Sequence, residues 1–170
     1  QDIEDAGSSG TRDASFAGVE VLEVDADGND LTIEGTSGDD TVNVLPLGAT
    51  TGLIDAGNSS PLIEYENASG ALTVGGGSAG NDVLQISGDT GINSGSASGS
   101  SVTFNSGTVT VGSGIDQVDV LGMGGDDDID LSGSGLPGSV GVQIFGGPVN
   151  DTIVGTPNND FIDGGAGNDD

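Results

Sequence analysis

The sequence predicts an all-β fold, and within that class a parallel β-solenoid or β-roll. Three observations support this: a nine-residue period at the C-terminal end, short aliphatic runs, and a composition rich in Gly but poor in helix formers. A β-sandwich followed by a short β-roll is the alternative, because short strands separated by Gly-rich turns also build sandwiches.

The nine-residue period is clearest in residues 146–170, which read GGPVNDTIV, GTPNNDFID and GGAGNDD. Each unit opens with Gly and has Asp at its sixth position, and the two complete units have Ile at the eighth. Asp151, Asp160 and Asp169 therefore recur at intervals of nine. The glycines at the early positions of these units are Gly146, Gly147, Gly155, Gly164, Gly165 and Gly167.

Imperfect copies of the same pattern lie upstream. GTSGDDTVN, GSAGNDVLQ and GMGGDDDID place Asp40, Asp82 and Asp127 at the sixth position, and the weaker copy VGSGIDQVD places Asp116 there. Successive sixth-position Asp residues are separated by 42, 34, 11, 24, 9 and 9 residues, so only the last two intervals are regular. The upstream Asp residues have no evident partner one coil away.

Short apolar runs recur along the chain between Gly, Ser, Asn and Asp residues, as expected of β-strands in a solenoid or sandwich. The predicted strands are residues 19–24, 31–34, 41–45, 62–65, 72–74, 83–86, 102–104, 108–111, 117–121, 129–131, 140–145, 152–154 and 161–163. We expect an irregular lead-in over residues 1–17, imperfect Gly/Asp-rich β repeats over 18–145, and the start of a regular nonapeptide β-roll over 146–170. The Ser/Gly-rich stretch 88–101 is predicted to be a flexible surface loop.

The Gly-Asp turns suit Ca²⁺. Gly tolerates the positive φ of tight turns and leaves backbone carbonyls accessible, and Asp adds a short carboxylate. Ca²⁺ takes six to eight oxygens at about 2.3–2.6 Å, so two stacked turns supply one shell. If two nonapeptides form one coil, Asp151 and Asp169 share one side and Asp160 lies opposite. The candidate ligand set is Asp151, Asp160, Asp169, Asp127, Asp82, Asp40 and Asp116, together with the six turn glycines named above. The alternative role for these Asp residues is to accept local N–H groups in turns.

Charge and composition exclude several functions. The net charge is −27, and Arg12 is the only Lys or Arg, so nothing neutralises the phosphates of nucleic acid. No stretch is long and apolar enough to span a membrane. Carboxylate pairs can perform glycosidic acid–base chemistry. The sequence lacks His, Lys and Cys, however, and has one Arg, so the usual bases and cations for nucleophilic and acidic-sugar chemistry are missing and we predict a non-catalytic protein. Hydrophobic residues make up 32% and are clustered, which argues against disorder.

The nonapeptides resemble the RTX (repeats-in-toxin) family of Gram-negative secreted proteins. The resemblance is strongest over residues 146–170, although Pro148 and Pro157 occupy third positions and Val149 and Asn158 replace the fourth-position Gly. It implies a right-handed parallel β-roll, Ca²⁺ held between successive turns, and folding after export.

The function that we expect is a non-catalytic, calcium-binding structural module of a large secreted or cell-surface bacterial protein, such as an adhesin stalk, matrix or envelope component. One alternative is a self-assembling subunit of an extracellular filament or layer, joined end to end. The other is an accessory repeat module of an exported polysaccharide-modifying enzyme.

Overall fold

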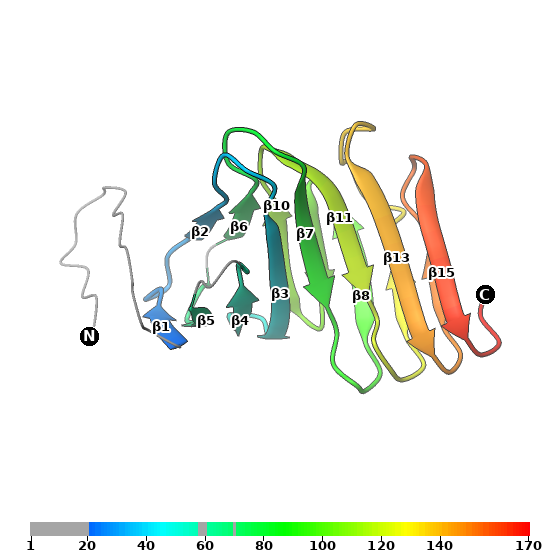
Figure 1. Ribbon diagram of the computed structural model, residues 1–170. Coiled ribbons are helices and arrows are strands. Elements are labelled where there is room, and N and C mark those ends of the chain that lie inside the picture. Colours follow the sequence, from blue (N-terminus) through cyan, green and yellow to red (C-terminus); the bar gives the residue numbers. More distant parts are fainter. Residues whose placement is uncertain (1–20, 58–60, 70) are drawn as a thin grey trace.

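The computed structural model describes residues 21–57, 61–69 and 71–170, and within them the protein is all-β and contains no helix (Figure 1). The lead-in expected over residues 1–17 lies outside this part of the chain. The strands are β1 (Val21–Asp25), β2 (Leu31–Glu34), β3 (Thr41–Gly48), β4 (Thr51–Asp55), β5 (Leu62–Glu66), β6 (Leu72–Gly75), β7 (Asp82–Ser87), β8 (Ser94–Ser98), β9 (Ser101–Phe104), β10 (Gly107–Val111), β11 (Ile115–Leu121), β12 (Asp128–Asp130), β13 (Gly141–Pro148), β14 (Thr152–Val154) and β15 (Asp160–Ala166).

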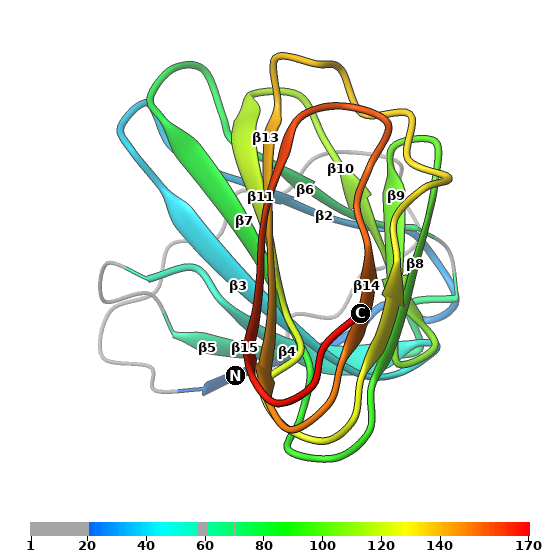
Figure 2. The ribbon, with the colours of Figure 1, turned by 90° about the vertical axis from the view of Figure 1, so that its right-hand side faces the viewer.

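The strands form two open sheets between which the chain repeatedly crosses. One sheet has eight strands in the order β1-β5-β4-β3-β7-β11-β13-β15, and the other has seven in the order β14-β12-β8-β9-β10-β6-β2. Most neighbouring strands are parallel, and the antiparallel pairs are confined to β3-β4-β5 and β8-β9-β10. Seen from the C-terminal end, the two sheets face each other across an interior that the turns enclose (Figure 2).

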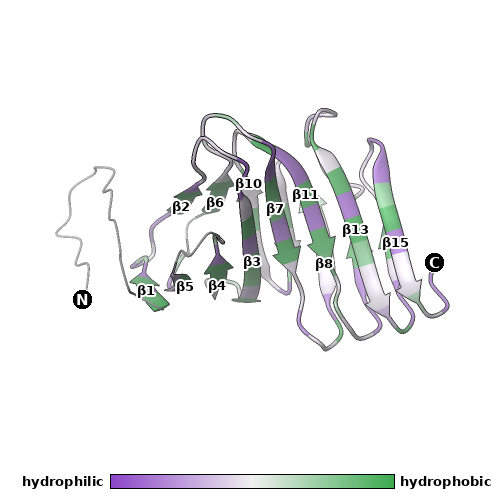
Figure 3. Cartoon of the chain, viewed as in Figure 1, coloured by the Kyte–Doolittle hydropathy of each residue, from purple (hydrophilic) through white to green (hydrophobic). Residues whose placement is uncertain are grey.

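The core consists of aliphatic side chains stacked in register along the sheets. Val44 of β3 lies beside Ile86 of β7, which is followed by Val120 of β11 and Ile144 of β13, and all four are completely buried. Side chains alternate between the two faces of a strand, so every second residue enters this stack and its neighbours face outward. Figure 3 shows the resulting bands of hydrophobic and hydrophilic residues along β13.

Each predicted strand has a counterpart in the structure, but β4 and β8 were not predicted. The prediction of a flexible surface loop over residues 88–101 is wrong, because β8 lies within this stretch and pairs with both β9 and β12. The sequence of β8, SGSAS, has no large apolar residue. Its Gly95 instead lies against the Phe104 ring of β9, where a Cβ would come within 2.7 Å of a ring carbon. Tertiary packing thus stabilises a strand that local propensity does not favour.

The C-terminal end of the stack exposes apolar side chains. Ile162 of β15 pairs with the buried Ile144 and so continues the inward-facing row, but it is 46% exposed. Phe161 of β15 and Val154 of the edge strand β14 pair with Gln143 and Asp130, so both face outward, and both are exposed. Within the described residues, the hydrophobic core therefore thins toward this end.

Candidate metal centre

Two rows of turns lie at the two ends of the strands of the eight-stranded sheet, and nearly all of these turns have Asp at the sixth position. Row 1 comprises the turns at the start of β3, β7, β11 and β15, and row 2 comprises the turns that follow β7, β11, β13 and β15. In Figure 1 row 1 lies along the upper edge and row 2 along the lower edge. The sixth residues of row 1 are Asp40, Asp82, Asp116 and Asp160. Those of row 2 are Asn93, Asp127, Asp151 and Asp169.

A ladder of hydrogen bonds joins the sixth residues of row 2. The Asn93 backbone N–H donates to Asp127 Oδ1 at 2.7 Å, and the Asp127 N–H donates to Asp151 Oδ1 at 2.8 Å. The Asp151 N–H donates in turn to Asp169 Oδ1 at 3.0 Å. Each carboxylate thus uses one oxygen to hold the preceding turn, which places four successive turns in register.

Row 1 has a shorter ladder of the same kind. The Asp40 N–H donates to Asp82 Oδ1 at 2.9 Å, and the Asp82 N–H donates to Asp116 Oδ2 at 3.0 Å. The turn that leads into β13 lies between the turns of Asp116 and Asp160. This turn, residues 131–141, has no acidic side chain. Asp160 accepts a hydrogen bond from Thr156 Oγ1 at 2.6 Å, as Asp40 does from Thr36 Oγ1 at 2.9 Å. The structure therefore brings three of the row 1 Asp residues together and leaves Asp160 apart from them.

The coil length decreases along the chain. The ladder partners are 42 and then 34 residues apart in row 1, and 34, 24 and 18 residues apart in row 2. The upstream Asp residues therefore do have partners one coil away, contrary to the sequence-based expectation. The interval of 18 places Asp151 and Asp169 on one side, and Asp160 in the opposite row, as two nonapeptides per coil predict.

Two oxygens in row 2 are buried and have no hydrogen-bond partner within residues 21–57, 61–69 and 71–170. They are Oδ2 of Asp127 and Oδ2 of Asp151, whose side chains are 2% and 1% exposed. A buried, unpaired carboxylate oxygen is strongly unfavourable. Burial accordingly raises the pKa of Asp127, and the charges of Asp151 and Asp89 raise it further against the lowering effect of hydrogen bonds from Asn93. A positive charge bound beside these two oxygens would offset the free-energy cost of burying them unpaired.

The first Gly of each turn keeps the space beside these oxygens open. A Cβ on Gly146 would contact Asp151 Oδ2 and come within 2.7 Å of the Gly164 carbonyl oxygen in the next coil. A Cβ on Gly122 would likewise collide with Asp127 Oδ2 and the Gly146 carbonyl oxygen. A carboxylate oxygen and a carbonyl oxygen from the next coil therefore approach the same glycine face.

The donor set fits a hard cation bound mainly by backbone and carboxylate oxygens. Among the described residues, no group of three or more His, Cys, Asp or Glu side chains is close enough to hold a metal by itself. Any cation at row 2 must therefore take backbone carbonyls as ligands in addition to the Asp pair, which is the mixed shell that Ca²⁺ accepts.

Residues 145–170 match the family model of the RTX calcium-binding nonapeptide repeat (4 copies). No curated protein and no solved structure matches the chain.

The RTX repeats include the row 2 turns that carry Asp151 and Asp169 and the row 1 turn that carries Asp160. The turn that carries Asp127 lies outside the matched residues, yet its sixth residue belongs to the same hydrogen-bond ladder. Sequence reasoning missed the first row 2 turn, residues 88–93, which reads GDTGIN. Gly at its first and fourth positions was the available signal, but Asn93 replaces the sixth-position Asp.

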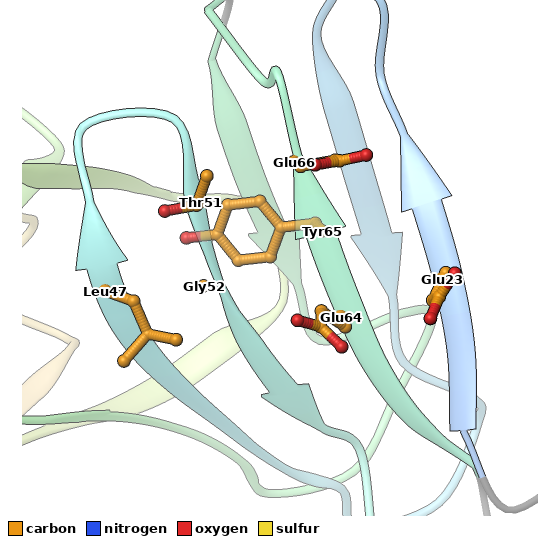
Figure 4. A pocket seen from close by; sticks show the side chains of 7 residues that line it. All are labelled: Glu23, Leu47, Thr51, Gly52, Glu64, Tyr65 and Glu66. Carbon is orange, nitrogen blue, oxygen red and sulfur yellow. The ribbon is translucent and has the colours of Figure 1, made fainter.

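A pocket of about 250 Å³ lies toward the other end of the stack, away from the RTX repeats (Figure 4). Its lining residues are Glu23, Leu47, Thr51, Gly52, Glu64, Tyr65 and Glu66. Glu23 and Glu64 lie directly opposite each other on the parallel strands β1 and β5, so like charges face one another. The Tyr65 ring extends toward Gly52, whose missing side chain makes room for it.

Among the described residues, no helix is long and apolar enough to cross a membrane.

Proposed function

We propose that this protein is a non-catalytic structural module, a parallel β-solenoid whose row 2 turns bind Ca²⁺, within a secreted or cell-surface bacterial protein. In this proposal residues 146–170 belong to a regular nonapeptide β-roll, which follows the imperfect Gly/Asp-rich β repeats expected upstream of it. The RTX match supports calcium binding, and RTX repeats are typically structural and found in exported proteins.

One observation carries the proposal: the Asp127 and Asp151 Oδ2 atoms are buried and unpaired one above the other in a hydrogen-bonded ladder. In the proposed site, Asp127, Asp151 and Asp169 supply carboxylate oxygens, and Gly146 and Gly164 supply carbonyl oxygens from neighbouring coils. A bound divalent cation supplies positive charge that neutralises the stacked carboxylates. Because both coils contribute ligands, binding holds one coil to the next and favours the folded state.

Row 1 offers a second set of candidate ligands. Asp40 and Asp82 are buried and joined by a hydrogen bond, and a Cβ on Gly76 would lie 2.6 Å from Asp82 Oδ2 and against the Gly114 carbonyl oxygen. Row 1 differs from row 2 in that Asp40 Oδ2 already accepts hydrogen bonds from the Thr36 N–H at 2.6 Å and Oγ1 at 2.9 Å. The ladder and the approach of carboxylate and carbonyl oxygens to Gly76 support binding there by Asp40, Asp82 and Asp116. We assign Asp160, which lacks a stacked Asp in its own row, to the end of the row 1 series.

Calcium titration of the whole chain by calorimetry, with circular dichroism before and after chelation, tests the proposal. We expect β-sheet signal to be lost on chelation and regained with Ca²⁺, and the double variant Asp151→Ala, Asp169→Ala to bind at least one ion fewer. The control is Asp128→Ala, Asp130→Ala, which removes the same charge from exposed positions of β12. If the wild-type chain bound no Ca²⁺, or both double variants bound as many ions as it does, the proposal would be wrong.

A specific observation favours self-association as a second candidate function. Val154, Phe161 and Ile162 expose apolar surface at one end of the stack, and strands at the edges of β-sheets readily pair with another chain. A head-to-tail contact between copies would extend both sheets and build a filament. Light scattering with and without Ca²⁺ tests this: Phe161→Asp should abolish concentration-dependent assembly, and a monomer at all concentrations would refute it.

A further inference from the structure

The row 2 ladder begins with an amide where the later coils have a carboxylate. Asn93 is completely buried, and its backbone N–H makes the same bond to the next coil as those of Asp127 and Asp151. The ladder therefore places these three residues in equivalent positions. Asn93 carries an amide where Asp127 and Asp151 carry a carboxylate.

The Asn93 side-chain nitrogen is surrounded by oxygens from both turns that enclose it. It donates to the Gly91 carbonyl at 2.8 Å, the Gly122 carbonyl at 2.8 Å and Asp127 Oδ1 at 3.0 Å, with a longer contact of 3.3 Å to the Asp89 carbonyl. Its oxygen accepts hydrogen bonds from the Asp89 N–H at 3.0 Å and from the Asn105 side-chain amide. Acceptors surround one end of the amide and donors the other, so its orientation is determined.

The coils that follow lack such a donor. The Oδ2 atoms of Asp127 and Asp151 have no partner among the described residues, and each lies with a carbonyl oxygen of the next turn around the Cβ position of a turn glycine. Carbonyl and carboxylate oxygens from two stacked turns thus converge at each junction in row 2. At the first junction the Asn93 N–H₂ group donates to oxygens of both turns, whereas at the later junctions no described residue donates to the Oδ2 of Asp127 or Asp151.

We propose that the Asn93 amide takes the place of a cation at the junction between residues 88–93 and 122–127, so that the row 2 calcium series starts one coil later. This inference rests on the proposed function, because it takes the junctions Asp127–Asp151 and Asp151–Asp169 as the calcium sites. It assigns Asn93 as the residue that determines where calcium dependence begins. The amide supplies N–H donors with no net charge, so this junction closes without metal.

The test replaces Asn93 in the whole chain and counts calcium ions. Asn93→Asp restores the sixth-position carboxylate, so we expect one additional ion per chain by calorimetry. We also expect a fall of roughly 5 °C in the melting temperature measured in EGTA, because a buried hydrogen-bonded amide becomes a buried unpaired carboxylate. The matched control is Asn43→Asp, which adds the same charge on the outward side of β3 and should leave the ion count unchanged.

A second variant distinguishes a surrogate cation from a ligand. Asn93→Ala removes the amide without adding charge, so the melting temperature should fall in both EGTA and Ca²⁺ while the ion count stays at the wild-type value. Loss of an ion in Asn93→Ala would overturn the inference, since it would make the Asn93 oxygen a calcium ligand. An unchanged ion count in a folded Asn93→Asp protein would also overturn it. Failure of the wild-type chain to bind Ca²⁺ would instead refute the proposed function.

Discussion

Asp127 and Asp151 lie one coil apart, and the backbone N–H of Asp127 donates to Asp151 Oδ1 at 2.8 Å while Oδ2 of each residue is buried without a partner. The same contact therefore does two things. It sets the register of consecutive coils, and it brings two negative charges together in the interior. In the proposed calcium site, folding and charge neutralisation are coupled at this contact, so we choose it as the first place to perturb the protein.

Asp127→Asn should lower the number of bound calcium ions by one and stabilise the chelated protein. The new amide can donate to the oxygens that Oδ2 now faces, as the Asn93 amide does one coil earlier, and it removes a buried charge. The gain in free energy of unfolding in EGTA is expected to be about 1–3 kcal/mol. Thermal melts in EGTA, combined with calorimetric ion counts, measure both effects.

Asp128→Asn is the matched control for that change. It removes the same charge from the next residue, whose side chain is exposed on β12, and should alter neither the ion count nor the melting temperature in EGTA by a comparable amount. A lower melting temperature of Asp127→Asn in EGTA with an undiminished ion count would contradict the assignment of Asp127.

Gly146→Ala should impair both calcium binding and folding. Its Cβ would collide with Asp151 Oδ2 and lie 2.7 Å from the Gly164 carbonyl oxygen, so the turn must open to accept it. Overpacking of this kind costs about 1–3 kcal/mol. Gly141→Ala, in the same strand, is the control, because a Cβ there would be 3.8 Å from its nearest neighbour, the Asp116 carbonyl oxygen. Equal calcium affinity and stability of the two variants would argue against a calcium site in the space between Gly146, Asp151 Oδ2 and the Gly164 carbonyl oxygen.

Chelation should loosen the C-terminal coils before the central coils. The central strands bury Leu84, Ile86, Val118 and Val120 completely, whereas Ile162, which continues the inward-facing row in β15, is 46% exposed. Coils with little buried apolar surface depend most on the cation, so their amides should exchange first. Hydrogen exchange by mass spectrometry, with EGTA and with Ca²⁺, measures this order. Simultaneous loss of protection in β7 and β15 would show that the coils unfold as one unit.

Alkaline titration should report the burial of Tyr65, the only tyrosine in the sequence. Burial raises the pKa of Tyr65 from 10.0 to about 12. The unfolded chain loses this proton more easily than the folded protein. The contribution of neutral Tyr65 to the free energy of unfolding is therefore full below pH 10 and is lost as the pH rises toward 12. Absorbance at the phenolate band gives the midpoint directly. A midpoint near 10 in the folded protein would mean that Tyr65 is not enclosed as described.

Local sequence patterns were enough to predict most strands but not two of them. Alternation of apolar and polar residues identified β3, β7 and β11, because their buried residues are aliphatic and separated by polar ones. The alternation fails in β8, which consists of Ser, Gly and Ala and is a strand because β9 and β12 pair with it. Its burial depends on Phe104, which no local pattern can associate with Gly95.

The sequence by itself determined the chemistry of the turns. Gly at the first position and Asp at the sixth specify a tight turn with an accessible carboxylate, and the regular spacing of nine identified the partnership of Asp151 and Asp169. These are local relations, since they depend on backbone freedom and on which side chain a residue carries.

Only the tertiary structure decided which of the other turns stack. Asp127 is 34 residues from Asn93 and 24 from Asp151, because hairpins and loops of different length lie between equivalent turns. Hydrogen bonds between parallel strands determine the register regardless of how much chain intervenes, so a fixed period in the sequence is not required. The same register places the Asn93 amide among four oxygens, which a single Asn in a Ser/Gly-rich stretch does not reveal.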